Sequence, residues 1–166
     1  MSDYTTNSTW LQNVADALAA VAGGLSLANG VEVKAIVWAP RETGKRPAAV
    51  VELPSIERVK ADEAESQIGS RDVRLNFPVV FYFDLTDSPQ FAQTQAAETV
   101  EAFVDALDAA KNAGNPLATD QLEGSVVIDA KAQVDPPEIM PGEESSARPA
   151  IRYVCRAEVL AFIPDV

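Results

Sequence analysis

The stretch Leu75–Gln93, LNFPVVFYFDLTDSPQFAQ, changes its hydrophobic period in the middle and decides the fold. Before Asp84 the apolar residues alternate, which predicts a strand with one face buried in a sheet. The predicted buried face consists of Val73, Leu75, Phe77, Val79, Phe81 and Phe83. Pro78 has no amide hydrogen to donate, so we expect a bulge or an edge position near it.

After Asp87 the spacing becomes that of a helix, predicted over residues 88–111. Asp87 can cap this helix, with Pro89 near its first position and Gln90 three residues after the cap. The predicted inner face consists of Phe91, Ala96, Val100, Phe103, Leu107 and Ala110, and the outer face of Glu98, Glu101, Asp105 and Asp108. A buried strand therefore leads directly into an amphipathic helix that can pack back onto the sheet.

The N-terminal half contains one more helix and two more strands. Residues 9–22 have apolar residues at helical spacing, and the stretches 31–38 and 47–54 are rich in β-branched and other apolar residues. The polar residues between these two stretches suggest a hairpin with a projecting basic loop. The charged stretch 55–70 has few apolar residues, so we expect a frayed helix or an extended loop there.

The C-terminal half ends in two strands, predicted at 125–134 and 150–163. The stretch 135–149 between them holds four prolines and is expected to be irregular. Cys155 lies within the last alternation and is expected to be a small core residue. The predicted fold class is α+β: a mixed or antiparallel sheet with two helices packed on one face, in a single domain spanning residues 1–166 with long loops.

Charge and composition limit the function. The net charge is −12, of which residues 84–166 contribute −10 (5 basic and 15 acidic side chains), so binding to phosphate backbones is disfavoured. The chain has no histidine and one cysteine, which excludes an internal disulfide and the usual histidine-based catalytic and zinc sites. The N-terminus, MSDYTTNSTW, has no signal-peptide pattern, and no apolar run is long enough to span a membrane.

Few motifs carry chemistry. The stretch 39–46, APRETGKR, nearly matches a phosphate-binding loop, but Arg46 replaces the required hydroxyl and a strand follows it. Acidic pairs occur at Asp84/Asp87, Glu98/Glu101, Asp105/Asp108 and Glu143/Glu144. Solvated acids explain these pairs better than a hydrolytic or metal site does. We therefore expect a protein that is not an enzyme and that uses no cofactor and no metal.

The basic residues concentrate in one region, which contains Arg41, Lys45, Arg46 and Arg71. Such a loop can pair with an acidic surface of a neighbouring copy, or it can be a freely solvated hairpin tip. The candidate residues for contacts with other subunits or with a tube are Arg41, Lys45, Arg46, Ile68, Arg71, Glu143 and Glu144.

Three segments in this order carry a family resemblance: GSRDVRLNFPVVFYF, AETVEAFVDALDAA and LEGSVVIDAKAQV. The sequence resembles the tail terminator proteins of long-tailed bacteriophages, a group similar to the minor tail protein U family. The resemblance implies a hexameric ring that caps the tail tube, stops its polymerisation and offers a surface to the head-completion or connector protein. It also implies a place in the virion, at the head-proximal end of the tail, after assembly in the host cytoplasm.

In such a ring DNA would pass through the lumen without specific binding, and no membrane would be involved. The acidic side chains of residues 84–166 suit the wall of such a lumen. Finding these acidic side chains on the outer wall of a hexamer would contradict their expected place in the lumen. A head–tail connector or neck protein of the same fold remains an alternative. A small acidic binding module and an enzyme with a carboxylate pair are further alternatives.

Overall fold

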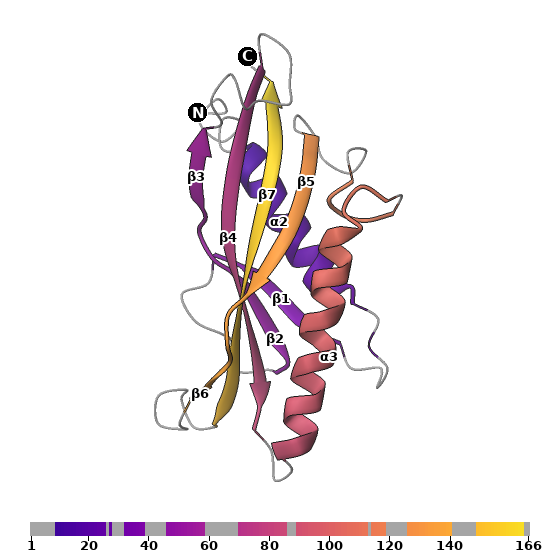
Figure 1. Ribbon diagram of the computed structural model, residues 1–166, viewed down its shortest axis with the longest axis vertical. Helices are drawn as coiled ribbons and strands as arrows, with labels where there is room; N and C mark the ends of the chain where they lie inside the picture. The colour runs from indigo at the N-terminus through magenta and orange to yellow at the C-terminus, as the bar shows by residue number, and fades with distance from the viewer. Residues whose placement is uncertain are drawn as a thin grey trace.

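The computed structural model describes residues 9–25, 27, 32–38, 46–58, 70–85, 89–112, 114–118, 126–140 and 149–164. This part of the chain forms two helices and one seven-stranded sheet (Figure 1). The elements are α2 (Thr9–Gly23), β1 (Lys34–Val37), β2 (Ala48–Val51), β3 (Ser55–Arg58), β4 (Ser70–Asp84), α3 (Pro89–Asp108), β5 (Val126–Val134), β6 (Glu138–Met140) and β7 (Ala150–Pro164). The α+β class and the mostly antiparallel sheet are confirmed.

The two longest strands, β4 and β7, form the centre of the sheet. They pair antiparallel over their whole length, from Ser70 opposite Pro164 to Asp84 opposite Ala150. The strand order is β1-β2-β4-β7-β5, with β3 also beside β4 and β6 also beside β7. One half of the sheet therefore runs β3-β4-β7-β5, and the other half runs β1-β2-β4-β7-β6.

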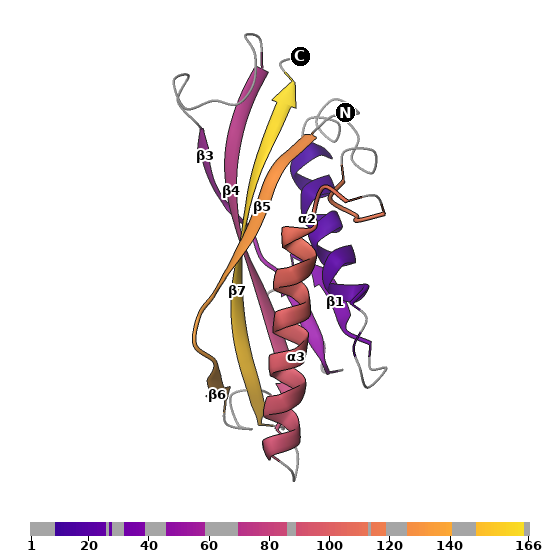
Figure 2. The same ribbon diagram turned by 45° about the vertical axis from the view of Figure 1, so that its right-hand side comes forward.

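Both helices cover the same face of this sheet, here called the inner face (Figure 2). The helix α2 packs against β1 and β2, whereas α3 packs against β4, β5 and β7. All the β4 residues predicted to be buried lie in this core: Val73, Leu75, Phe77, Val79, Phe81 and Phe83. The edge of one ring meets the face of another between Phe81 and Phe103, whose centroids lie 5.2 Å apart. The predicted faces of the strand, and two helices on one side, are confirmed.

The buried stripe of α3 follows the prediction except at its start. Ala96, Val100, Phe103, Leu107 and Ala110 are buried, and the four acids assigned to the outer face are exposed. The inner-face assignment of Phe91 is wrong, because its side chain is 54% exposed. The stripe enters the first turn through Ala92 instead, which lies one helical turn before Ala96.

The predicted hairpin between β1 and β2 is also wrong, because these strands pair in parallel. The pairing runs from Lys34 opposite Ala48 to Val37 opposite Val51, and the amide of Trp38 donates to the Val51 carbonyl at 2.9 Å. Alternation assigns residues to the two faces of a strand but is the same for either strand direction. The sequence pattern therefore located these strands and could not orient them.

Pro78 lies in a continuous stretch of β4, so the predicted bulge is absent there. Its neighbour on one side changes at this point, because β2 ends opposite Val79 and β3 begins opposite Asn76. The Pro78 carbonyl accepts a hydrogen bond from the Glu52 amide, which lies in the short connection between the two strands. A missing amide hydrogen is tolerated here because neither β2 nor β3 pairs with Pro78 on that side of β4.

Two segments that were expected to be irregular contain short strands. Ser55–Arg58, in the charged stretch 55–70, forms β3 along β4, and Glu138–Met140, in the proline-rich stretch, forms β6 along β7. Each is a short edge strand that pairs with the long strand beside it. Local composition does not predict such strands because the neighbour supplies the pairing.

The core around Phe103 should control stability, whereas Phe91 on the same helix should not. We expect Phe103→Ala to lower the free energy of unfolding by about 3–5 kcal/mol, because it removes a fully buried ring and leaves a cavity. Phe91→Ala should change it by less than about 1 kcal/mol, because most of that ring is exposed. Urea denaturation of both variants tests this, and equal losses would contradict the described orientation of α3.

Candidate interaction surfaces

Most residues predicted to make contacts with other subunits are not placed by the structure. Arg41, Lys45, Ile68, Glu143 and Glu144 lie outside the described residues, as does Asp87. Arg71 belongs to β4, where its backbone pairs with Ile163, and its side chain is not described. Arg46 is therefore the one member of the predicted set whose side chain can be assessed.

The Arg46 side chain is buried against residues of its own chain. Only 1% of this side chain is exposed, and its guanidinium lies 3.0 Å from the carboxylate of Asp84, which is 32% exposed. The guanidinium also donates to the Pro149 carbonyl at 3.1 Å. Arg46 thus joins the start of β2 to the end of β4 and the start of β7, a structural role that its place in a basic stretch did not indicate.

The carboxylates of α3 form a row on its solvent-exposed face. Glu98, Glu101, Asp105 and Asp108 are all exposed. Among the residues that the structure describes, no group of three or more histidine, cysteine or acidic side chains could hold a metal ion. The same residues include no helix that is long and apolar enough to cross a membrane.

Cys155 is buried in the inner core, as predicted. Burial raises the pKa of its thiol to about 12, and the negative charge of Asp135 acts in the same direction. A thiol in this state carries little thiolate at neutral pH and is a poor nucleophile and metal ligand.

The edge strands of the described sheet expose apolar side chains on the inner face. On one side, Ile56 of β3 lies opposite the buried Leu75 and is 53% exposed. On the other side, Val134 of β5 and Ile139 of β6 are exposed, although their partners Cys155 and Ile151 are buried. The inner face therefore extends to both edges and ends in uncovered apolar groups. Sequence reasoning missed Ile56 and Ile139 because it did not predict β3 or β6, whereas Val134 ends a strand that it did predict.

The opposite, outer face of the sheet carries charges. Arg74 of β4 lies 2.7 Å from Glu57 of β3 and 3.8 Å from Glu158 of β7, and Lys131 of β5 lies 3.6 Å from the same Glu158. These four side chains form a row of alternating sign across four strands, here called the charge row. Exposed pairs of this kind add little stability.

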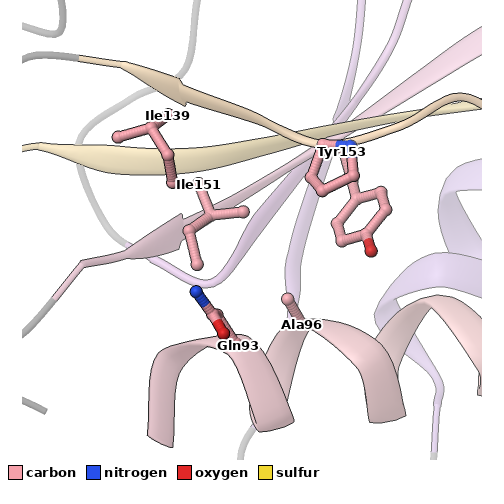
Figure 3. Close-up of a pocket in the computed structure, with 6 residues that line it drawn as sticks. Gln93, Ala96, Ile139, Ile151 and Tyr153 are labelled. Carbon is pink, nitrogen blue, oxygen red and sulfur yellow. The ribbon is translucent and has the colours of Figure 1, made fainter. Parts of the chain in front are cut away.

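A cavity of about 320 Å³ lies between the first half of α3 and the strands β6 and β7 (Figure 3). It is lined by Gln93, Ala96, Pro137, Ile139, Ile151 and Tyr153. Gln93 and Ile151 point toward each other across it, and the Tyr153 ring lies farther along toward the middle of the helix. Its size is at the lower end for sites that bind small molecules, and its lining is mostly apolar.

Comparisons with known proteins give a distant likeness to a solved structure. No protein-family model and no curated protein matches the sequence. Among solved structures, the chain is similar to a chain in the virion of a native gene transfer agent particle, with a TM-score of 0.42 and 15% identity over 92% of each chain. A likeness at this level does not assign a function to the chain.

The buried position of Arg46 leads to a stability prediction. We expect Arg46→Gln to lower the free energy of unfolding by about 1–3 kcal/mol, less than for a fully buried pair because water reaches Asp84. Arg74→Gln, which breaks more exposed pairs, should cost less than about 1 kcal/mol. Denaturant unfolding at neutral pH measures both. A larger loss for Arg74→Gln would contradict an internal role for Arg46.

The raised pKa of Cys155 predicts a pH dependence. The unfolded chain loses the thiol proton near pH 9, whereas the folded chain keeps it until pH is about 12, so this contribution to stability is complete below pH 9 and is lost as pH rises. By pH 10 the loss should be about 1 kcal/mol. Unfolding curves at pH 7 and pH 10 for the natural chain and Cys155→Ala test this, and an equal pH slope in both would contradict it.

Proposed function

We propose that the protein is a non-enzymatic structural component of a phage-like virion and that it acts by docking onto copies of itself and onto a tail tube. The observation that supports this proposal is the exposure of apolar side chains on the edge strands of the sheet. Large apolar side chains that stay exposed on an edge strand offer a surface that another protein can cover. Here the inner face ends at both edges in exposed apolar side chains: Ile56 on one side, and Val134 and Ile139 on the other.

Because the two edges of the sheet differ, they favour head-to-tail association of copies. When the contact patches on one subunit differ, successive copies join head to tail and form either a ring or a filament. A ring on the end of a tube needs such a contact, with a further face that fits the last tube subunits. Tube growth stops when the other face of the ring offers no docking site to another tube subunit.

The order of elements is consistent with the resemblance to tail terminator proteins. That resemblance is carried by a long strand that leads into a helix rich in alanine and glutamate, followed by two more strands, and these correspond to β4, α3, β5 and β7. The finer assignment we propose is therefore a tail terminator: a hexameric ring on the tube end, at the head-proximal end of the tail, that also receives the head-completion protein.

Particle assembly without the protein tests this proposal. In a host that produces the particles, deletion of the gene should yield tails of unregulated length, because nothing caps the tube. Complementation with the natural gene should restore the length, and so should the control Glu101→Gln, which changes an exposed residue of α3. Ile56→Asp should not restore it, because it places a charge on the apolar edge. Electron microscopy of the tails is the measurement.

The outcomes separate the two virion roles. Tails of normal length without heads would favour a head–tail connector or neck protein of the same fold. Complete, infectious particles without the protein would overturn both roles.

The cavity beside α3 supports a second candidate function, a small binding module. Its mostly apolar lining and its volume are compatible with a small apolar ligand. Saturable binding of an apolar fluorescent probe, abolished by Ala96→Leu, would support this function. Probe binding that is unchanged by Ala96→Leu would count against it.

A further inference from the structure

The charge row ends at the two edges of the described sheet with opposite signs. Glu57 lies on β3 at one edge and Lys131 lies on β5 at the other, and their side chains are 68% and 67% exposed. Between them stand Arg74 and Glu158, so the sequence of signs across the sheet is negative, positive, negative, positive. A second copy placed beside the first in the same orientation would continue this alternation without a break.

The directions of the strands allow a continuous ladder between such copies. β3 is antiparallel to β4, β4 to β7, and β7 to β5. It follows that β3 and β5 of one chain run in opposite directions. When copies stand side by side, β3 of one therefore meets β5 of the next as an antiparallel neighbour, which is the arrangement that a short edge strand can join.

One register satisfies both faces of the sheet. With Glu57 of one copy opposite Lys131 of the next, the antiparallel pattern sets Ile56 opposite Ala132 and Ser55 opposite Gln133. Ile56 is large and exposed, whereas Ala132 is small and half-buried, so the branched side chain gains cover without a clash between two large groups. Opposite charges meet on the outer face, and apolar groups meet on the inner face.

The shape of β5 limits the contact to this region. The register of β5 against β7 shifts between Val127 and Asp129, which marks a bulge, and it is regular from Asp129 to Val134. A bulge on an edge strand disrupts further pairing. The regular part is long enough for the four residues of β3, Ser55–Arg58.

We propose that β3 of one copy pairs antiparallel with β5 of a second copy, with Glu57 opposite Lys131, so that the sheet continues from subunit to subunit. This pairing rests on the proposed function, because it supplies the contact between neighbouring subunits that a ring requires. It predicts a heterologous contact in which each copy uses both edges.

Disulfide trapping tests the register directly. We would mix Ser55→Cys protein with Gln133→Cys protein carrying a size tag and oxidise the mixture. Directly opposite residues on antiparallel strands have Cα atoms about 4.5–5.5 Å apart, within the range that a disulfide spans. We expect the mixture to give a disulfide-linked heterodimer in a yield at least about tenfold greater than the yield of linked homodimer from either protein alone. When one chain carries both substitutions, oxidation should give a ladder of longer products. The buried thiol of Cys155 should not take part.

The matched control replaces Glu138, an exposed residue of β6 in the other half of the sheet. Ser55→Cys mixed with Glu138→Cys should give only background cross-linking. Background yield from the Ser55→Cys and Gln133→Cys mixture would overturn the proposed pairing. So would equal yields from the test and control mixtures.

Charge reversal provides a second test that does not depend on oxidation. In Glu57→Lys each contact would place lysine opposite lysine, and in Lys131→Glu it would place glutamate opposite glutamate. Each variant should therefore associate with itself at least about fivefold more weakly than the natural protein. An equal mixture of the two restores opposite charges at every contact when the variants alternate, so association should return to within about twofold of the natural level.

Sedimentation velocity and native mass spectrometry measure this association. Glu138→Lys, which breaks a comparable exposed ion pair with Arg152 away from the proposed contact, should associate like the natural protein. Thermal melting of each variant shows that it remains folded. A mixture that associates no better than its components would overturn the proposal. A loss confined to Lys131→Glu would also overturn it, since two β5 strands could instead pair with each other through Lys131 and Asp129.

The two proposals can fail separately. Unregulated tails in the deletion strain, together with background cross-linking of residues 55 and 133, would leave the virion role and remove this contact. Efficient, register-specific cross-linking in a protein that is dispensable for tails would leave the contact and remove the virion role.

Discussion

The antiparallel pairing of β4 with β7 is the constraint on which the rest of the structure depends. Fifteen consecutive residue pairs hold the two strands in one register, and every other strand of the described sheet pairs with one of them except β1, which pairs with β2. In β4 every second side chain from Val73 to Phe83 faces the helices, so a slip of one residue would expose all of them at once. The register is therefore strongly specified, and the flanking strands can be short.

Short flanking strands leave the sheet with two different halves. Beside β4, β2 covers one half and β3 the other, and the change falls at Pro78, where a proline is tolerated. In the half that contains β3, the sheet is four strands wide, its outer face carries the charge row, and its inner face ends at Ile56. The half that contains β2 instead has the ion pair of Arg46 and Asp84 at its end. Both halves have edge strands, but the charge row lies in the half that contains β3.

Local sequence patterns were sufficient to predict which side chains of a long strand or helix are buried. The six alternating residues of β4 and the helical spacing from Ala96 to Ala110 predicted both faces correctly, because burial of those residues sets the period. Local patterns did not predict features that are set by the strand with which a segment pairs. The direction of β1 and the existence of β3 and β6 depend on the strands with which they pair. The same limit applies to Arg46, whose partner Asp84 is 38 residues away.

The candidate surface illustrates this limit, because an edge is a property of the whole sheet. Glu57 lies in a stretch of ordinary charged residues, and Lys131 lies in an ordinary strand; neither is distinctive in the sequence. Only the strand order places them at opposite ends of one row. A two-fold contact would use one edge twice and leave the other uncovered, whereas a head-to-tail contact covers both edges. In this acidic chain, the position of a few basic groups, rather than the net charge, would then decide how copies associate.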